Sequence, residues 1–371
     1  MPTLSAPVGE AATTDNLHKS LKKRLVRRQS PDRSQQIRRA VQMVFLMLNA
    51  GIGLQFILWV RYFESQGSSR YFERPAGVDG WLPIAGLMNL RYFLATRHVP
   101  AIHPSAMVLL CIFLLSSLLV KKAFCSWLCP VGTMSEYAAG LGRRVFGRNV
   151  RLPRWADIPL RGLKYLLLGF FVFAIGAMSA EALEQFMQSP YGLVADVKML
   201  NFFREIGLTG AIVVGSLMLG SLLVQNFWCR YLCPYGALLG LVSLLSPVKI
   251  RRDVEACIDC GKCAKACPAG LAVDKLLQIR SAECTACMEC VAACSAQDAL
   301  QLALPPRQSA PLRERWTKRT LGPVAVACVL MYLLLAVVLF ARMTNHWKTE
   351  MPRSVYLRLV PYADQVTHPG M

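Results

Sequence analysis

Charged residues are scarce in this sequence of 371 residues. Asp, Glu, Lys and Arg make up 17% of the chain, whereas hydrophobic residues make up 54% and the mean hydropathy is +0.37. A set of soluble domains needs a more polar surface, so this composition excludes an ordinary soluble protein and indicates a membrane protein. Five apolar stretches are long enough to cross a bilayer, which takes about 20 helical residues. These predicted spans lie at residues 41–60, 104–120, 163–181, 207–227 and 321–341.

No predicted span carries a charged residue near its centre. This absence excludes the carboxylates that line the pathways of proton pumps. Histidine is scarce as well, with five residues in the chain, and His98, His103 and His346 lie beyond the ends of the spans. A haem would need histidines inside the bundle, so haem is disfavoured. A cleavage site of small residues is also missing after the first span, which is therefore predicted to be a retained anchor.

Acidic residues are too few to balance the basic ones, with 22 against 42 and a net charge of +20. Of the 42 positive charges, 31 fall in residues 1–40, 121–164 and 230–319. Two predicted spans separate each of these segments from the next, so all three lie on the same side of the membrane. The positive-inside rule places such segments in the cytoplasm. The basicity therefore reflects topology and contact with membrane lipid, and no nucleic-acid binding is expected. The N-terminus is predicted to be cytoplasmic and the C-terminus periplasmic.

Aromatic residues are absent from residues 237–315, a segment that contains eight cysteines. A soluble domain of this size normally needs aromatic side chains in its core, so something else must organise it. The segment contains a Cys-x2-Cys-x2-Cys-x3-Cys-Pro run that begins at Cys257, and a second run of the same cysteine spacing begins at Cys284. This is the pattern of bacterial ferredoxins with two 4Fe-4S clusters, in which the fourth cysteine of each run binds the other cluster.

The crossed pattern predicts the ligands of both clusters. Small residues between the cysteines, such as Gly261 and Ala286, allow the backbone to close around inorganic sulfide. A pair of zinc ribbons is the alternative, but zinc sites rarely contain three cysteines at two-residue gaps. The predicted ligands are Cys257, Cys260, Cys263 and Cys294 for one 4Fe-4S cluster, and Cys284, Cys287, Cys290 and Cys267 for the other.

A Cys-x3-Cys-Pro motif occurs twice, each time directly after an apolar run. Residues 115–132 and 219–236 align without gaps and share ten of 18 residues. One excursion out of and back into the membrane separates them, so both helices point the same way and the repeats are parallel. Residues four apart lie on one face of a helix, and the proline is expected to end that helix. The cysteines of these motifs are Cys125, Cys129, Cys229 and Cys233.

Several kinds of chemistry suit these four thiols. If the repeats pack face to face, the thiols can bind a third metal centre, act as a dithiol redox couple or bind Cu(I). The alternative is a compact structural turn at the point where the chain leaves the lipid. For a quinol, Glu181, Glu184 and Gln185 at the outer end of the third span are candidate pocket residues, although an ordinary polar helix end is the simpler interpretation.

The predicted fold is an all-α polytopic membrane protein of about five transmembrane helices with a parallel internal repeat. A bacterial two-cluster ferredoxin domain of the α+β class is inserted in it. Residues 62–103 form an outer loop that contains an interfacial or re-entrant helix. The predicted divisions are a basic cytoplasmic tail (1–40), a four-helix membrane domain (41–248), the cytoplasmic ferredoxin domain (249–305), a linker with the fifth helix (306–341) and a periplasmic tail (342–371).

The two ferredoxin motifs, together with "CSWLCP" and "CRYLCP", resemble the membrane polyferredoxin family of NapH and the C-terminal part of NosR. The resemblance covers about residues 41–305. It implies a multi-pass protein of the bacterial inner membrane, and a non-catalytic electron-transfer subunit of a respiratory or reductase system rather than an enzyme. Electrons from quinol or a cytoplasmic donor would pass through two 4Fe-4S clusters to a partner redox protein. The alternative is a maturation factor that reduces copper or delivers it to a metalloenzyme.

Overall fold

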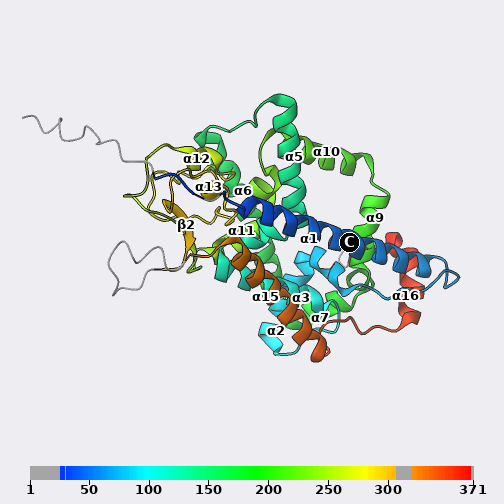
Figure 1. Cartoon of the computed structure of the whole chain (residues 1–371). Helices are drawn as coiled ribbons and strands as arrows, with labels where there is room; N and C mark the ends of the chain where they lie inside the picture. Colours follow the sequence, from blue (N-terminus) through cyan, green and yellow to red (C-terminus); the bar gives the residue numbers. More distant parts are fainter. Residues whose placement is uncertain (1–25, 30, 306–319, 369–371) are drawn as a thin grey trace, which may run out of the picture.

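A computed structural model of the chain describes residues 26–29, 31–305 and 320–368 (Figure 1). Three described helices are long and apolar enough to cross a membrane, and in their most apolar windows only 22%, 17% and 17% of residues are buried by the rest of the protein. Most of their apolar side chains therefore face outward, as contact with lipid requires. These helices are α1 (Ser34–Glu64), α6 (Arg154–Ala177) and α15 (Pro323–Met343).

The other two predicted spans are shorter or broken. The second is α3 (Pro104–Val120), a helix of 17 residues. The fourth is α10 (Leu208–Leu223), which meets α9 (Ala195–Arg204) at an angle of 82° and counts as a further candidate span only if the bent pair is taken together. The described residues thus contain three candidate spans of full length, or four with the bent pair.

The repeats follow the same course with a break before each cysteine motif. In the first repeat, α3 is followed by α4 (Ala123–Trp127) and α5 (Pro130–Phe146). In the second, α10 is followed by a π-helical turn, η3 (Trp228–Leu232), and by α11 (Pro234–Ser243). The expectation that each cysteine pair lies on one continuous helix is wrong. The proline does end the first segment, but its fixed φ also starts a new helix directly after the second cysteine.

The ferredoxin domain lies at one end of the molecule, near the start of α1 (Figure 1). Its strands β1 (Lys249–Arg252) and β2 (Leu300–Ala303) pair antiparallel, with Lys249 opposite Ala303. Its two short helices are α12 (Lys262–Ala266) and α13 (Glu289–Ala292). The chain before α1 joins this domain, because the N–H of Arg28 donates to the carbonyl of Ser295 at 3.2 Å.

The first repeat supplies an aromatic side chain that the ferredoxin domain lacks. Trp127 is fully buried, and its Nε1–H donates to the carbonyl oxygen of Ala286 at 3.1 Å. The hydroxyl of Ser126 donates to the carbonyl of Thr285 at 2.6 Å. A buried indole needs a partner for its N–H, so this contact fixes the domain on the repeat in a single orientation.

The opposite end of the molecule is built from short elements. The outer loop contains η2 (Ala76–Trp81) and the predicted helix, α2 (Pro83–Thr96). The chain after α15 packs onto the end of α1, where the ring centroids of Tyr356 and Trp59 lie 4.9 Å apart. The remaining elements are α7 (Ala180–Gln188), α8 (Pro190–Leu193), α16 (Arg353–Leu359) and η4 (Val360–Gln365).

Candidate iron–sulfur and thiol sites

The two cysteine runs of the ferredoxin domain share one backbone path. Asp259 and Ala286, at equivalent positions 27 residues apart, have φ values of 53° and 49°. Gly261 and Met288, also equivalent, have φ values of 68° and 59°. Left-handed residues that alternate with ordinary ones turn successive N–H groups toward one side and form a concave site for anions. Both loops therefore suit the negatively charged sulfides of an iron–sulfur cluster.

The eight ferredoxin cysteines gather into two groups of electrostatic neighbours. In the first, which we call the outer thiol group, Cys294 interacts with Cys257, Cys260 and Cys263. The second, the inner thiol group, brings Cys267 from the first run to the cysteines of the second. Its members are Cys267, Cys284, Cys287 and Cys290. These are the groups that crossed ligation requires, and the ligation itself stays a prediction.

The two groups differ in exposure. Cys260 of the outer thiol group is exposed, whereas Cys284 and Cys290 of the inner thiol group are buried. Burial raises the pKa of the Cys284, Cys287 and Cys290 thiols, because a thiolate is costly to hold away from water. Iron would displace these protons and compensate the charge, so metal binding and folding are coupled here.

The spacing of the ligand atoms argues against a single zinc ion. Four sulfurs around one zinc lie about 3.8 Å apart, given Zn–S bonds of about 2.3 Å. Within the described part of the chain, one set of three or more His, Cys, Asp or Glu ligand atoms lies mutually within 4.8 Å, and it contains no cysteine. Among the described residues, no three cysteine sulfurs therefore have the close spacing of a zinc site.

The four cysteines of the repeats converge on one cavity. Cys125, Cys129, Cys229 and Cys233, which we call the thiol quartet, all line a cavity of about 790 Å³. Cys229 interacts electrostatically with the other three, so thiols of both repeats are neighbours. The sulfur of Cys233 accepts the N–H of Gly236 at 3.2 Å, at the start of α11. This hydrogen bond offsets only part of the effect of burial, which raises the pKa of the Cys233 thiol.

The same cavity reaches the ferredoxin domain. Its walls are apolar side chains of α1, α3, α6 and α15, and Cys287 of the inner thiol group lines its ferredoxin end. Arg38, Glu136 and Glu289 line that end too. Arg38 is buried and donates to Glu136 at 2.6 Å and to Glu289 at 3.1 Å. The sequence does not predict this cluster, because nothing distinguishes Arg38 from the other basic residues of residues 1–40.

The quinol candidates at the end of the third span lie elsewhere. Glu181, Glu184 and Gln185 are exposed on α7 and are not among the residues that line the cavity. The carboxylate of Glu184 accepts from the hydroxyl of Tyr92 at 3.2 Å and from Gln188 at 3.0 Å. The expectation of a pocket there is not met by the described residues, and the simpler interpretation as a polar helix end fits them.

Two lysines pair with Glu283, which precedes Cys284 of the inner thiol group, and a third lysine reaches the carbonyl of Ser281. Lys164 is fully buried, and its Nζ lies 2.7 Å from each carboxylate oxygen of Glu283. The Nζ of Lys122 lies 3.7 Å from that carboxylate. Lys121 is also buried and donates to the carbonyl of Ser281 at 3.4 Å. The sequence did contain a signal, because Lys121 and Lys122 interrupt the otherwise similar repeats.

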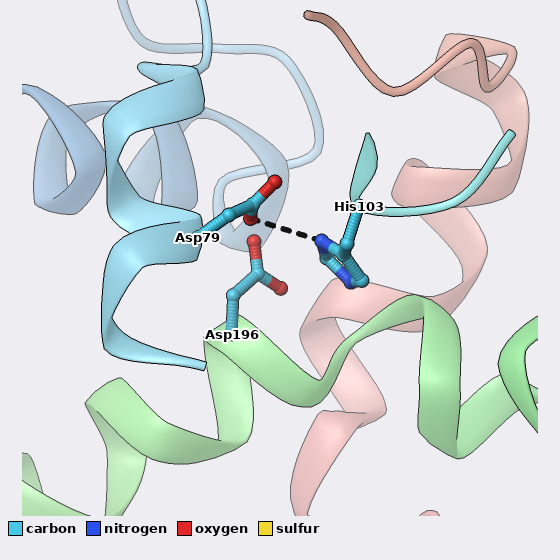
Figure 2. Close-up of side chains that lie close together, drawn as sticks. All are labelled: Asp79, His103 and Asp196. Atoms are coloured by element: carbon cyan, nitrogen blue, oxygen red, sulfur yellow. Dashed lines mark hydrogen bonds and ion pairs between the residues drawn. The ribbon is translucent and has the colours of Figure 1, made fainter. Parts of the chain in front are cut away.

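A second buried cluster lies at the opposite end of the molecule. Figure 2 shows Asp79, His103 and Asp196 pointing toward one another, close enough to hold a metal ion. The guanidinium of Arg74 pairs with both carboxylates, at 2.7 Å to Asp196. The ring nitrogens of His103 lie 3.0 Å from Asp79 and 3.1 Å from the carbonyl of Gly192. Arg74 thus occupies the place of a cation, and the cluster is an internally compensated set of charges.

Comparisons with known proteins agree with the cysteine patterns. A family model described as a 4Fe-4S binding domain matches residues 102–149 and 206–253, the two repeats. A model described as a 4Fe-4S dicluster domain matches residues 249–295. No solved structure shows significant similarity.

Curated relatives are also similar over most of the chain. The identity is 49% over 331 residues with YccM of Escherichia coli, which is provisionally named an electron transport protein, and covers 89% of this chain and 91% of the relative. The identity with the ferredoxin-type protein NapH of Escherichia coli is 30% over 252 residues, covering 66% and 80% of the two chains. With the regulatory protein NosR of Pseudomonas aeruginosa it is 29% over 187 residues, covering 48% and 24%.

Proposed function

Because the chain belongs to the membrane polyferredoxin family of NapH and NosR and carries iron–sulfur electron-transfer domains, we propose a specific relay. Single electrons from quinol or a cytoplasmic donor pass through two 4Fe-4S clusters to a partner redox protein. The outer thiol group holds one cluster and the inner thiol group the other. The chain acts as a non-catalytic subunit in the bacterial inner membrane, with its N-terminus and ferredoxin domain in the cytoplasm and its C-terminus in the periplasm.

The observation that carries this proposal is the order of the sites. The outer thiol group reaches solvent at Cys260, the inner thiol group is buried at Cys284 and Cys290, and its Cys287 shares one cavity with the thiol quartet. A relay between an aqueous partner and the membrane needs this sequence of exposed, buried and membrane-side sites. The clusters supply reversible one-electron chemistry when bound, at a potential that charge, hydrogen bonds and burial adjust.

The protein's own residues position and insulate the sites. Trp127 and Ser126 hold the inner loop at the first repeat through hydrogen bonds to the carbonyls of Ala286 and Thr285. The left-handed loop residues turn N–H groups toward the sulfur positions. The apolar walls of the cavity exclude water from the membrane side of the inner thiol group.

The cavity is our candidate site for quinol. Its volume of about 790 Å³ lies in the range of small-molecule pockets, about 300–1,000 Å³. Apolar walls suit an isoprenoid tail, and the charged side chains of Arg38, Glu136 and Glu289 offer polar groups to a quinol head. A quinol bound there would lie beside Cys287, within reach of the inner cluster.

Iron content and EPR test the proposal of two clusters. Protein purified without oxygen should contain about eight irons, the number that two 4Fe-4S clusters require. After reduction with dithionite, the two clusters should give magnetically interacting signals. Far fewer irons with no interacting signals would overturn the proposal.

Copper handling is the second candidate, favoured by the convergence of four soft thiols on one cavity. The same four thiols can instead hold a third metal centre of the relay. Replacing Cys125, Cys129, Cys229 and Cys233 with serine separates these functions. Intact electron flux with lost Cu(I) binding favours copper handling, whereas lost flux with unchanged copper content assigns the thiol quartet to the relay.

A further inference from the structure

The two repeats differ in charge at one place. Lys121 and Lys122 of the first repeat align with Gln225 and Asn226 of the second, in a stretch where the flanking residues are largely identical. Residues with neutral amide side chains therefore fit at the break between the helices of the second repeat. The two positive charges of the first repeat need a different explanation.

Lys121 is held in a conformation that favours glycine. Its φ is 56° and its ψ is −166°, a region that residues with a side chain rarely adopt. It is nevertheless fully buried, with its N–H donating to the hydroxyl of Ser246 at 3.0 Å and its Nζ to the carbonyl of Ser281. Such strain persists where the surroundings enforce it, and here it directs an ammonium group toward the ferredoxin domain.

The charge beside the inner thiol group is not balanced. Lys121 and Lys122 both act electrostatically on Cys284, and Lys122 and Lys164 act on Cys125 and Cys233. Glu283 is the carboxylate that pairs with them. Near Cys287, Arg38 pairs with two carboxylates, those of Glu136 and Glu289, so the positive charge that is in excess is that of the lysines around Glu283. Three ammonium groups against one carboxylate leave an excess of positive charge in a site of low polarity, where charge acts strongly.

The charges beside the outer thiol group are paired or exposed to solvent, and the exposed ones include Arg27 and Lys262 near Cys294. Arg252 lies 2.9 Å from Asp259, and Arg28 lies 2.8 Å from Asp32. Solvent also reaches Cys260 and screens the fields of nearby charges. The electrostatic environment thus favours an added electron more strongly at the inner group than at the outer one.

We propose that Lys121, Lys122 and Lys164 raise the reduction potential at the inner thiol group above that at the outer thiol group. Electrons then pass from the exposed outer cluster toward the membrane cavity. Of the two donors proposed above, this order selects a soluble one-electron carrier that docks at the exposed face, and it makes a quinone in the cavity an acceptor rather than a donor. Burial alone would lower the potential of the inner cluster, because the reduced state carries the larger negative charge, and the lysines reverse this order. This inference rests on the proposed function and adds its direction.

A redox titration followed by EPR tests the order of the potentials in the intact protein. A water-soluble dysprosium chelate identifies the outer cluster, because it enhances the relaxation of signals close to the surface. The shielded cluster should have the higher midpoint potential in the wild type. A higher midpoint for the exposed cluster would overturn the inference while leaving two clusters in place, whereas absence of both signals and of iron would overturn the proposed function itself.

Variants test whether the lysines set the order of the two midpoint potentials. Lys122→Asn, which copies the second repeat, should reduce the equilibrium constant for electron transfer from outer to inner cluster at least tenfold, about 59 mV for a one-electron couple. Lys122→Arg should preserve the wild-type order. Lys348→Gln removes one charge at the opposite end of the molecule and should shift neither midpoint. Equal shifts of the midpoint potentials in Lys122→Asn and Lys348→Gln would contradict the inference.

A second variant covers the case in which Lys122→Asn fails to retain iron. Lys121→Gly relieves the left-handed backbone while removing the charge, so it should not lose stability through the backbone. It should still lower the inner midpoint and leave the outer one unchanged. Unchanged midpoints in Lys121→Gly would show that the lysine is purely structural.

Discussion

At the scale of single residues, His103 shows how this chain holds charge away from water. Burial alone would lower its pKa, but the carboxylate of Asp79 outweighs that effect and raises it. Its Nδ1 lies 3.0 Å from a carboxylate oxygen of Asp79 and 3.2 Å from the guanidinium of Arg74, and its Nε2 lies 3.1 Å from the carbonyl oxygen of Gly192. The two acceptors favour the charged imidazolium, which Arg74 opposes. The charged cluster shown in Figure 2 therefore links η2, α3 and α9.

Replacing His103 with glutamine should destabilise the protein by about 3 kcal/mol, since it leaves buried carboxylates with one cation fewer. The folded-state pKa of His103 is raised, so its contribution is complete below about pH 6.5 and is lost as pH rises through the folded value. Thermal unfolding in detergent should show a stability loss from pH 6 to pH 9 in the wild type that His103→Gln lacks. His98→Gln, at an exposed histidine, is the control, and equal pH slopes in all three proteins would refute this role.

The pKa of Asp79 shifts in the opposite direction. Burial alone would raise it, but Arg74 and His103 outweigh that effect and lower it below its usual range. The stability that Asp79 contributes is present above about pH 4 and is lost as pH falls through the folded value. Asp79→Asn should therefore flatten the acid limb of a stability profile between pH 5 and pH 3, and an unchanged limb would assign acid unfolding to other carboxylates.

At the scale of elements, the two repeats use one motif for different contacts. Trp127 and Tyr231 stand at equivalent positions, and both are buried with a satisfied polar atom. The indole of Trp127 bonds the ferredoxin domain at Ala286, whereas the hydroxyl of Tyr231 bonds Asp157 of α6 at 2.7 Å. At this position the first repeat contacts the ferredoxin domain and the second contacts a membrane helix, although the neighbouring Arg230 also donates to the carbonyl of Pro268 in the ferredoxin domain at 3.1 Å.

Trp127→Phe and Tyr231→Phe test that division. Each loses one buried hydrogen bond, a change of about 1–3 kcal/mol. The carbonyl of Ala286 loses its partner only in Trp127→Phe, so this variant should release iron from the ferredoxin domain faster in the presence of a chelator. Equal rates of iron loss in both variants would show that docking does not depend on the indole.

The glycine that follows each Cys-x3-Cys-Pro motif gives a second comparison between the repeats. A Cβ added at Gly132 would lie 2.2 Å from the carbonyl oxygen of Cys125, whereas one at Gly236 would lie 3.6 Å from that of Cys229. Gly132→Ala should therefore cost about 2 kcal/mol or more through overpacking, while Gly236→Ala should be tolerated. Similar melting temperatures of the two variants would mean that the first motif relaxes without loss.

At the scale of the whole molecule, the sequence predicted the components better than their connections. Hydropathy located α1, α6 and α15, since long apolar runs have few alternatives to a membrane helix. The spacing of the ferredoxin cysteines predicted two groups because the motif itself specifies the crossing. The breaks at Lys121 and Asn226, where φ is positive, could not be predicted, since the surrounding structure and not the local sequence enforces them.

The buried charges were also beyond prediction from the sequence. Arg38, Lys122 and Lys164 lie in segments whose basic residues the topology alone explained, and their partners Glu136, Glu283 and Glu289 are distant in the chain. Only the folded arrangement shows that Arg38, Lys122 and the three carboxylates line the cavity that Cys287 also lines. The difference between Lys121–Lys122 and Gln225–Asn226 was the one sequence signal that could have drawn attention to them.

The order in which the clusters become reduced tests the relay most directly. Oxidised protein in liposomes is mixed rapidly with a membrane-impermeant reductant and frozen at successive times for EPR, with the dysprosium chelate distinguishing the two clusters. Because the inner cluster has the higher potential, we expect the first electron that enters at the outer cluster to be found on the inner one, and the outer cluster to remain reduced only afterwards. Cys260→Ser, which alters the entry site, should slow reduction of the inner cluster strongly. Reduction of the inner cluster at an unchanged rate in Cys260→Ser, or accumulation of the reduced outer cluster before the inner one in the wild type, would contradict a linear path from the surface to a higher-potential inner cluster.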